Sequence, residues 1–209
     1  MRIGIGVTSY NRPECLEKWK QQIAKHTSMY NVLIYIAVDS DIDRRGVAFR
    51  KNECLRALQE CDHVFLFDDD CWPIRHGWEW QYINSDFQHL LFLSETHDPE
   101  FKCGGGVKHG ECGGVMMYMT KKCIDHVGAF DEQYNMWGFE HADYSRRICN
   151  AGLIYWPYVH LDGSDEYLHS EDYSNPSHKS SISNEDKAKY FAENFQKFRN
   201  KTKQIYLPL

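Results

Sequence analysis

Residues 63–73 read HVFLFDDDCWP, and they combine a short apolar run with three consecutive aspartates. Residues 63–67 have the length and apolar character of a buried β-strand. The three carboxylates after it would repel one another strongly unless a cation neutralised them. Carboxylate oxygens suit Mg²⁺ or Mn²⁺, which keep open coordination positions for water and substrate phosphates. An exposed acidic turn is the alternative, but the position at a strand end favours a metal site.

Strands and helices alternate on the N-terminal side of this segment. Residues 2–9 alternate as a strand, and residues 31–38 form a second β-branched and aromatic run. Apolar residues at helical spacing follow each of these strands, over residues 13–25 and 47–59. This order predicts an α/β fold with a mostly parallel central sheet flanked by helices. Ligands of such sheets bind beyond the carboxyl ends of the strands.

Local sequence patterns also predict secondary structure in the C-terminal half. Glycines at 113–114 precede an expected strand at 115–119, and the pattern predicts a helix over 140–150. Residues 170–183 are polar and rich in turn formers, which predicts a mobile loop. An amphipathic helix is expected over 184–200, with several aromatic residues available for packing.

Composition limits the classes of protein to consider. The 209 residues, 42% of them hydrophobic, can bury a substantial core, and we expect a single domain over residues 1–209. The absence of an apolar run of about 18 residues predicts no membrane span and, with no signal-like start, a cytoplasmic location. A formal net charge of -6 disfavours a nucleic-acid partner. The eight cysteines show no CxxC spacing, so free thiols are expected rather than disulfides.

Residues 67–73 resemble the DxD motif of GT-A-fold glycosyltransferases, with Asp68 and Asp70 as the outer aspartates. Further segments resemble the same family in the same order, and the resemblance covers about residues 3–169. These segments are the first nucleotide-binding loop at 7–13 (VTSYNRP), the glycine-rich residues 113–116 (GGVM), the turn at 127–132 (VGAFDE) and the motif at 137–143 (WGFEHAD).

The resemblance implies a metal-dependent glycosyltransferase. Such an enzyme moves a sugar from a nucleotide-sugar donor, most commonly a UDP-sugar, to a hydroxyl acceptor such as a glycan. In the family the DxD motif holds Mn²⁺ against the donor diphosphate, so Asp68 and Asp70 are the expected ligands of Mn²⁺ or Mg²⁺. A histidine downstream often completes the set; His169 fits that placement, and His160 is the alternative.

The resemblance also implies different roles for three parts of the chain. Residues 1–112 would bind the nucleotide sugar, residues 113–169 would form the acceptor and catalytic half, and residues 170–209 would supply the loop, acting as a lid, and the terminal helix. Asp39 is expected near the base, and residues 50–52 (RKN) are expected near the ribose or diphosphate. A turn cap is the alternative role of Asp39, and a solvated helix charge is that of Arg50. The expected donor-binding residues are Thr8, Tyr10, Arg12, Asp39, Arg50, Asp68 and Asp69.

The sequence departs from the family pattern at His141. Inverting relatives usually carry an aspartate after the glutamate as the general base, whereas the order here is Glu140-His141. A neutral imidazole can accept the acceptor proton, so His141 is the expected base of an inverting transfer and Glu140 the alternative. Trp137, Gly114 and Asp143 are expected to position the acceptor, and support of the adjoining helix is the alternative role of Asp143.

Two other classes of function stay open from the sequence. A GT-A-like nucleotidyltransferase shares the architecture, but it normally has a glycine-rich, basic first loop, which residues 8–11 (TSYN) do not form. A non-catalytic nucleotide-sugar-binding module is the second, because the departure at residues 140–141 permits the loss of the base.

Overall fold

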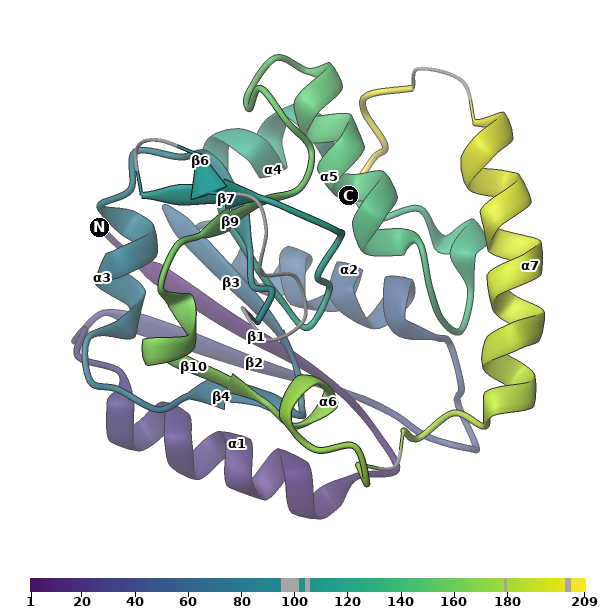
Figure 1. Ribbon diagram of the computed structural model, residues 1–209, viewed down its shortest axis with the longest axis horizontal. Coiled ribbons are helices and arrows are strands. Elements are labelled where there is room, and N and C mark those ends of the chain that lie inside the picture. The colour runs from purple at the N-terminus through teal and green to yellow at the C-terminus, as the bar shows by residue number, and fades with distance from the viewer. Residues whose placement is uncertain (95–101, 104–105, 179, 202–203) are drawn as a thin grey trace.

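The computed structural model describes residues 1–94, 102–103, 106–178, 180–201 and 204–209. They form a central sheet in the order β2-β1-β3-β8-β5-β9-β7-β6, with helices on both faces (Figure 1). The strands, in that order, are Val32–Asp39, Ile3–Tyr10, His63–Asp68, Met116–Thr120, His89–Leu91, Val159–Leu161, Val107–His109 and Lys102–Cys103.

Most strands of this sheet run in one direction. β1 pairs in parallel with β2 and β3, and β5 pairs in parallel with β9. β8 runs antiparallel to β3 and β5, and β7 runs antiparallel to β9 and β6. The expected α/β fold around a mostly parallel sheet flanked by helices is confirmed.

One face of the sheet is covered by α1 (Pro13–His26) and α3 (Trp78–Ile83). Side chains alternate along a strand, so Phe65 and Phe67 of β3 both point to this face. The rings of Phe65 and Trp78 meet edge to face with centroids 4.7 Å apart, an arrangement that aromatic pairs favour. This packing fixes β3, and with it the aspartates at its end.

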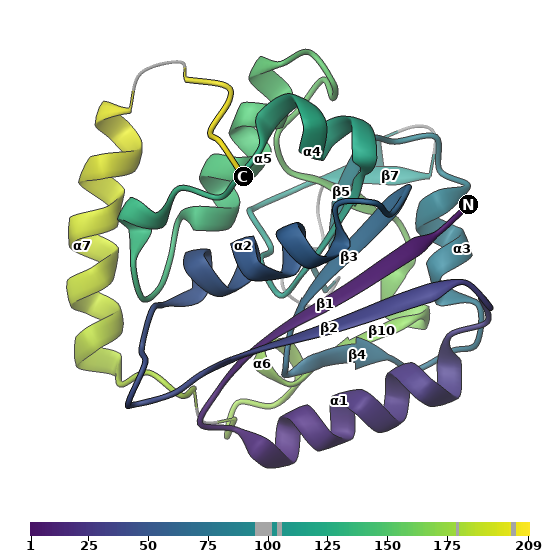
Figure 2. The same ribbon diagram turned by 180° about the vertical axis from the view of Figure 1, so that it is seen from behind.

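The opposite face is covered by α2 (Val47–Leu58), α4 (Lys121–Val127) and α5 (Glu140–Asn150). Figure 2 shows α2 lying across β1 and β3 on this side. The close approach depends on glycine, because a Cβ at Gly6 would lie 2.9 Å from the Cβ of Cys54. The side chains on both sides of β3 are therefore buried, one set in each of the two hydrophobic clusters.

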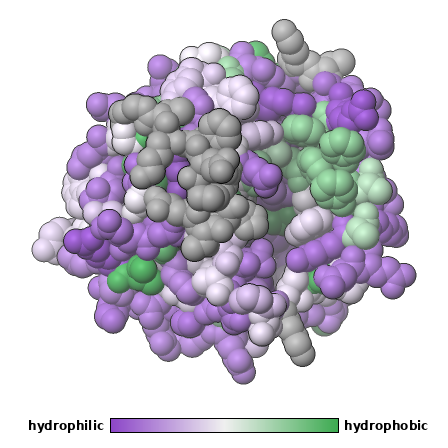
Figure 3. Space-filling view, in the orientation of Figure 1, coloured by the Kyte–Doolittle hydropathy of each residue, from purple (hydrophilic) through white to green (hydrophobic). Residues whose placement is uncertain are grey.

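The last helix, α7 (Asn184–Asn200), packs beside the segment that leads into α5. Phe139 contacts three of its aromatic rings, with centroid distances of 5.2 Å to Phe191, 5.9 Å to Phe195 and 5.4 Å to Phe198. Figure 3 shows hydrophobic residues gathered over this helix, where Phe191 is 51% exposed. The expected packing role of the aromatic residues is thus observed.

A smaller sheet pairs β4 (Cys71–Pro73) with β10 (Leu168–Ser170), and α6 (Glu171–Ser174) follows β10. The seven cysteines whose side chains the structure describes are free thiols. Among the described residues, no helix combines the length and the apolar character that a membrane crossing needs.

Candidate functional site

Three strand ends meet at one edge of the sheet. Because β1, β2 and β3 are parallel, their last residues, Tyr10, Asp39 and Asp68, lie at the same edge. The antiparallel β8 begins there, and Asp68 N donates a hydrogen bond to Val115 O at 2.9 Å. A cavity opens at this edge of the sheet, and residues from β1, β2 and β3 contribute to its lining.

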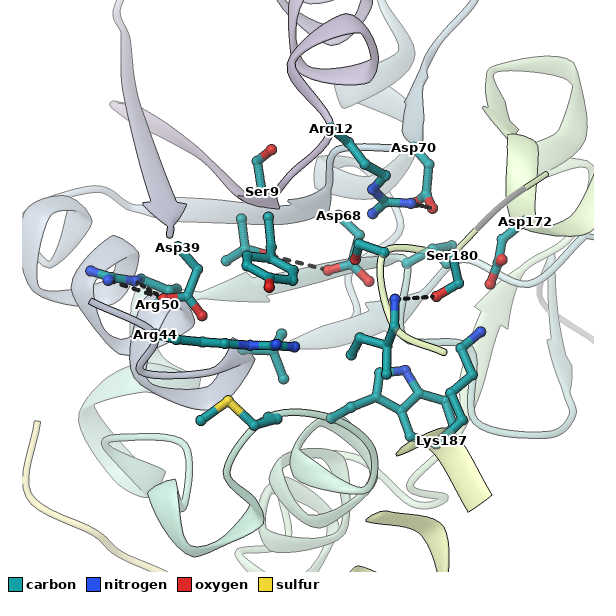
Figure 4. Close-up of a pocket in the computed structure, with 18 residues that line it drawn as sticks. Ser9, Arg12, Asp39, Arg44, Arg50, Asp68, Asp70, Asp172, Ser180 and Lys187 are labelled. Carbon is teal, nitrogen blue, oxygen red and sulfur yellow. Dashed lines mark hydrogen bonds and ion pairs between the residues drawn. The ribbon is translucent and has the colours of Figure 1, made fainter. Parts of the chain in front are cut away.

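Charged side chains line this cavity along its whole length, and we call it the donor cavity. Figure 4 shows Asp39, Arg44 and Arg50 at one end, Asp172, Ser180 and Lys187 at the other, and Asp68 between them. Of the seven expected donor-binding residues, Asp69 alone is absent from its lining.

Asp39 and Arg50 brace the loop between β2 and α2. The Asp39 carboxylate accepts hydrogen bonds from the backbone N–H groups of Arg45 and Gly46, both at 2.9 Å, and from Arg50 Nη2 at 3.1 Å. Burial opposes the charge of Arg50, but hydrogen bonds to Glu53 and the neighbouring aspartates outweigh it and raise the pKa of Arg50. Both residues therefore cap the loop and line the cavity.

The first loop is tied to the aspartates by its side chains. Thr8 Oγ1 donates to Asp68 Oδ1 at 3.2 Å, and Ser9 Oγ donates to Asp69 Oδ2 at 2.5 Å. Arg12 forms ion pairs with both Asp69 and Asp70. Burial raises the pKa of Asp69 to about 7, although Arg12 and Ser9 act in the opposite direction.

Tyr10 provides an aromatic surface in the cavity, beside Arg44. Its hydroxyl donates to Asp41 Oδ1 at 2.6 Å, and the Arg44 guanidinium carbon lies 4.1 Å from the centroid of its ring. A cation over an aromatic face is an attractive arrangement. The pair forms a flat, charged wall beside Asp39.

Asp70, Asp172 and His178 form a group that fits a divalent cation. One ligand atom from each lies within 4.8 Å of the other two, and His178 Nε2 is 3.1 Å from Asp70 Oδ2. Asp70 Oδ1 is buried and accepts no hydrogen bond from the residues that the structure describes. Carboxylate and imidazole donors suit Mn²⁺, so the residues present fit the ion that the family resemblance implies.

The structure does not bring His169 to this group. His169 lies opposite Trp72 in the pairing of β10 with β4, with ring centroids 5.3 Å apart, and its Nε2 is 3.6 Å from Glu171 Oε1. The alternative, His160, is fully buried and its Nε2 donates to the backbone carbonyl of Glu111 at 2.8 Å. Sequence reasoning therefore missed both Asp172 and His178.

A second cavity adjoins the donor cavity, and we call it the acceptor cavity. The two cavities share Asp68, Val115, Trp137 and Asp172, and Gly114, Glu140 and His141 line the second one. The His141 ring packs on Gly114, because a Cβ at that glycine would lie 2.8 Å from two ring carbons. Residues 114, 137, 140 and 141 are thus brought together as expected.

A buried lysine connects the two cavities. Lys51 is 1% exposed, and its Nζ lies 3.1 Å from Glu140 Oε1 and 3.6 Å from Asp68 Oδ1. Burial opposes the charge of Lys51, but Asp68 and Glu140 outweigh it and raise its pKa. The family resemblance placed residues 50–52 near the ribose or diphosphate, but nothing in the sequence indicated that Lys51 is buried, because a lysine at helical spacing carries no signal of burial.

Glu140 and His141 form a hydrogen-bonded pair at the start of α5, with His141 Nδ1 3.1 Å from Glu140 Oε1. Burial alone would raise the pKa of Glu140, but Lys51 and His141 lower it well below its usual range. Burial opposes the charge of His141, and Cys112 and Glu140 raise its pKa to about 10. Glu140 Oε2 is buried without a hydrogen-bond partner among the described residues.

Asp143 lies away from both cavities. It is fully buried, and its Oδ2 accepts from Arg147 Nε at 2.9 Å and from Lys201 Nζ at 2.8 Å. Arg147 in turn donates to the backbone carbonyls of Val127 and Ala129. The placement corrects the expected contact with the acceptor: Asp143 supports α5 and the C-terminal segment.

The sequence of this chain has limited similarity to the sequences of known proteins. No family model matches the chain. A protein of Acanthamoeba polyphaga mimivirus that carries the name uncharacterized glycosyltransferase is 27% identical over 142 residues, which is 59% of this chain and 53% of that protein. The chain thus spans about half the length of that relative.

Similar solved structures share the fold at low identity. A mannosyltransferase from Pyrobaculum calidifontis matches with a TM-score of 0.55 and 14% identity, over 77% of this chain and 54% of that chain. The catalytic domain of Drosophila beta1,4-galactosyltransferase 7 matches with a TM-score of 0.51 and 15% identity, over 90% and 79% of the two chains. The chain therefore has the GT-A fold of these glycosyltransferases.

Proposed function

We propose that this protein is a metal-dependent glycosyltransferase that moves a sugar from a nucleotide-sugar donor to a hydroxyl acceptor. The observation that carries the proposal is the junction of two cavities, one beside a group of side chains that fits a cation and the other lined by the hydrogen-bonded pair of Glu140 and His141. The similar mannosyltransferase holds GDP-Man and Mn²⁺, and the similar galactosyltransferase, as a mutant, holds manganese, UDP-Gal and xylobiose. These ligands support the same classes of donor and acceptor here.

The donor cavity accounts for the binding of the nucleotide sugar. The base and ribose lie at the end that Tyr10, Asp39 and Arg50 form, and the diphosphate lies toward Asp68 and the cation group. UDP is the proposed nucleotide, since it is the commonest in the family that the sequence resembles. Residues 1–112 supply most of the lining of this cavity, and residues 113–169 and 170–209 supply the rest.

Asp70, Asp172 and His178 would hold Mn²⁺ or Mg²⁺, with Asp68 beside them. When bound, the ion neutralises the negative charge that develops on the departing diphosphate. Arg12 ion-pairs with Asp69 and Asp70, which keeps these carboxylates from repelling each other in the protein alone. His178 thereby takes the ligand role for which His169 was expected.

The acceptor cavity supplies the base. His141 Nδ1 hydrogen-bonds to Glu140 Oε1, and in the neutral form of the ring Nε2 accepts the proton of the acceptor hydroxyl. Because the pKa of His141 is raised to about 10, this neutral form is the minor one at neutral pH. The acceptor oxygen bonds to the anomeric carbon as the bond from that carbon to the phosphate oxygen breaks, and the electron pair leaves with the diphosphate. Glu140 is the alternative base through its unpartnered Oε2. Trp137 and Gly114 position the acceptor, and inversion is the proposed outcome.

The test is to incubate the protein with UDP-sugars and with GDP-mannose, with and without Mn²⁺, and to measure release of the nucleoside diphosphate. Mn²⁺-dependent turnover supports the transferase. Binding of a donor without turnover under all conditions would instead identify a non-catalytic binding module. Failure of every nucleotide sugar to bind would refute the proposal.

A further inference from the structure

One face of α7 packs on the loop that carries Trp137, and its residue Lys187 lines the donor cavity. Lys187, Phe191, Asn194 and Phe198 are spaced by four, three and four residues, so they share a face of the helix. Asn194 is 1% exposed, and its side-chain amide donates to the backbone carbonyls of Tyr134 and Trp137, both at 2.8 Å. These bonds fix α7 against the loop that carries Trp137.

Lys187 stands at the end of this face, where α7 reaches the donor cavity. Its Nζ lies 5.5 Å from the centroid of the Trp137 ring. Figure 4 shows it at the same end of the cavity as Asp172. Its ammonium forms no ion pair or hydrogen bond with any residue that the structure describes.

The other lysines of this region are paired. Lys197 Nζ donates to the Gln133 carbonyl at 2.7 Å, and Lys201 Nζ lies 2.7 Å from Asp131 and 2.8 Å from Asp143. An ammonium held on a fixed helix, partly shielded from water and directed to a cavity, is suited to an anion that arrives with a ligand. The aspartates that line the cavity do not pair with this ammonium. Asp39 pairs with Arg50, Asp70 pairs with Arg12, and Asp68 lies 3.6 Å from Lys51. Asp172 lies at the same end of the cavity and forms no ion pair with Lys187 in the part of the chain that the structure describes.

We propose that Lys187 binds the diphosphate of the donor and stabilises its leaving group, from the side opposite the nucleotide end of the cavity. The assignment rests on the proposed function. When the bond between the anomeric carbon and the phosphate oxygen breaks, the electron pair passes to that oxygen, and Lys187 donates hydrogen bonds to the terminal phosphate without giving up a proton. Preorganised cations stabilise such developing charge.

The experiment measures binding of UDP and of UMP, each with Mn²⁺, to the wild type and to Lys187→Met and Lys187→Arg by calorimetry. UMP lacks the terminal phosphate, so it reports the nucleotide end alone. Lys189→Met is the matched control, because Lys189 is exposed on the same helix. We expect Lys187→Met to weaken UDP binding by about tenfold or more, a change typical of losing a hydrogen bond to a charged group, and to leave UMP binding unchanged. Lys187→Arg should retain most of the UDP affinity.

Two results would overturn the assignment. Equal UDP affinity in the wild type and Lys187→Met would remove Lys187 from the donor site while leaving the proposed function intact. An equal loss for UDP and UMP would show that Lys187 acts only by supporting Trp137. If the wild type bound neither UDP nor GDP with Mn²⁺, the proposed function itself would fail, which is a separate outcome.

Discussion

The ammonium of Lys51 lies 3.1 Å from the carboxylate of Glu140, and both side chains are buried. The pair joins α2 to the first turn of α5, the helix that carries the proposed base. Removing one partner of a buried pair leaves the other as an uncompensated charge, which is far more costly than losing an exposed pair.

We therefore expect Lys51→Met to lower the free energy of unfolding by about 3–5 kcal/mol, measured by urea denaturation at neutral pH. The double variant Lys51→Met with Glu140→Gln should recover part of the loss, because the unpaired carboxylate is then absent. Because the pKa of Glu140 is lowered on folding, its contribution to stability is present above its unfolded pKa and is lost as the pH falls. A single-variant loss below about 1 kcal/mol would contradict the pairing.

The pH dependence of transfer separates the two candidate bases. Only neutral imidazole accepts a proton, and the pKa of His141 is raised to about 10. If His141 is the base, kcat/KM should rise with pH through the neutral range toward that value, and His141→Ala should lower transfer by about a hundredfold or more and abolish the rise. If Glu140 is the base, Glu140→Gln should show the larger loss and the profile should be flat above about pH 5, because a carboxylate of lowered pKa is already ionised there.

The free energy of unfolding should also depend on the titration of His141. The folded pKa of His141 lies above the unfolded value, so its contribution is complete below about pH 6.5 and is lost as the pH rises toward 10. Urea midpoints of the wild type and His141→Ala should therefore converge as the pH rises. A constant difference across this range would argue against the raised pKa.

Replacing the proposed metal ligands should abolish Mn²⁺ binding without unfolding the protein. Asp70→Ala and His178→Ala each remove one donor of the group, and electron paramagnetic resonance of free Mn²⁺ measures what remains unbound. His169→Ala is the matched control, since that ring packs on Trp72 outside the group. Loss of Mn²⁺ affinity in His169→Ala, with normal affinity in His178→Ala, would reverse the assignment.

Gly114→Ala should impair the acceptor cavity selectively. The added methyl group would lie 2.8 Å from the His141 ring, so the ring must move. We expect transfer to fall by roughly tenfold or more while UDP affinity is unchanged, because small displacements of a catalytic group are costly. Initial rates at saturating donor, with UDP binding by calorimetry, measure both effects. If this variant transferred the sugar at the wild-type rate, the position of the His141 ring would not matter for transfer.

Local patterns predicted the longer elements well. The helices expected over 140–150 and 184–200 have the observed bounds of α5 and α7, because caps and apolar spacing are local properties. The short α3 and β10 carried no comparable signal. The alternation of strands and helices also predicted that Asp39 and Asp68 lie at one edge of the sheet, because parallel strands end on the same side.

Long-range contacts account for what the sequence did not predict. His169 fitted the spacing that the family resemblance implies for a metal ligand, but the pairing of β10 with β4 places it opposite Trp72. The chain after α6 instead brings His178 to Asp70. Asp143 follows the proposed catalytic pair, Glu140 and His141, in the sequence, yet helical geometry turns it toward Arg147, four residues on. No spacing rule distinguishes these outcomes, because each depends on how distant segments pack.

The side-chain amide of Asn194 ties α7 to the loop that carries Trp137. Trp137 belongs to both cavities, and the same helix carries Lys187 on the donor side. A donor that immobilises α7 would thereby immobilise Trp137 before the acceptor arrives. Thermodynamic reciprocity then requires the acceptor to tighten donor binding by the same factor, so the hydrogen bonds of one side-chain amide would couple the binding of the two substrates.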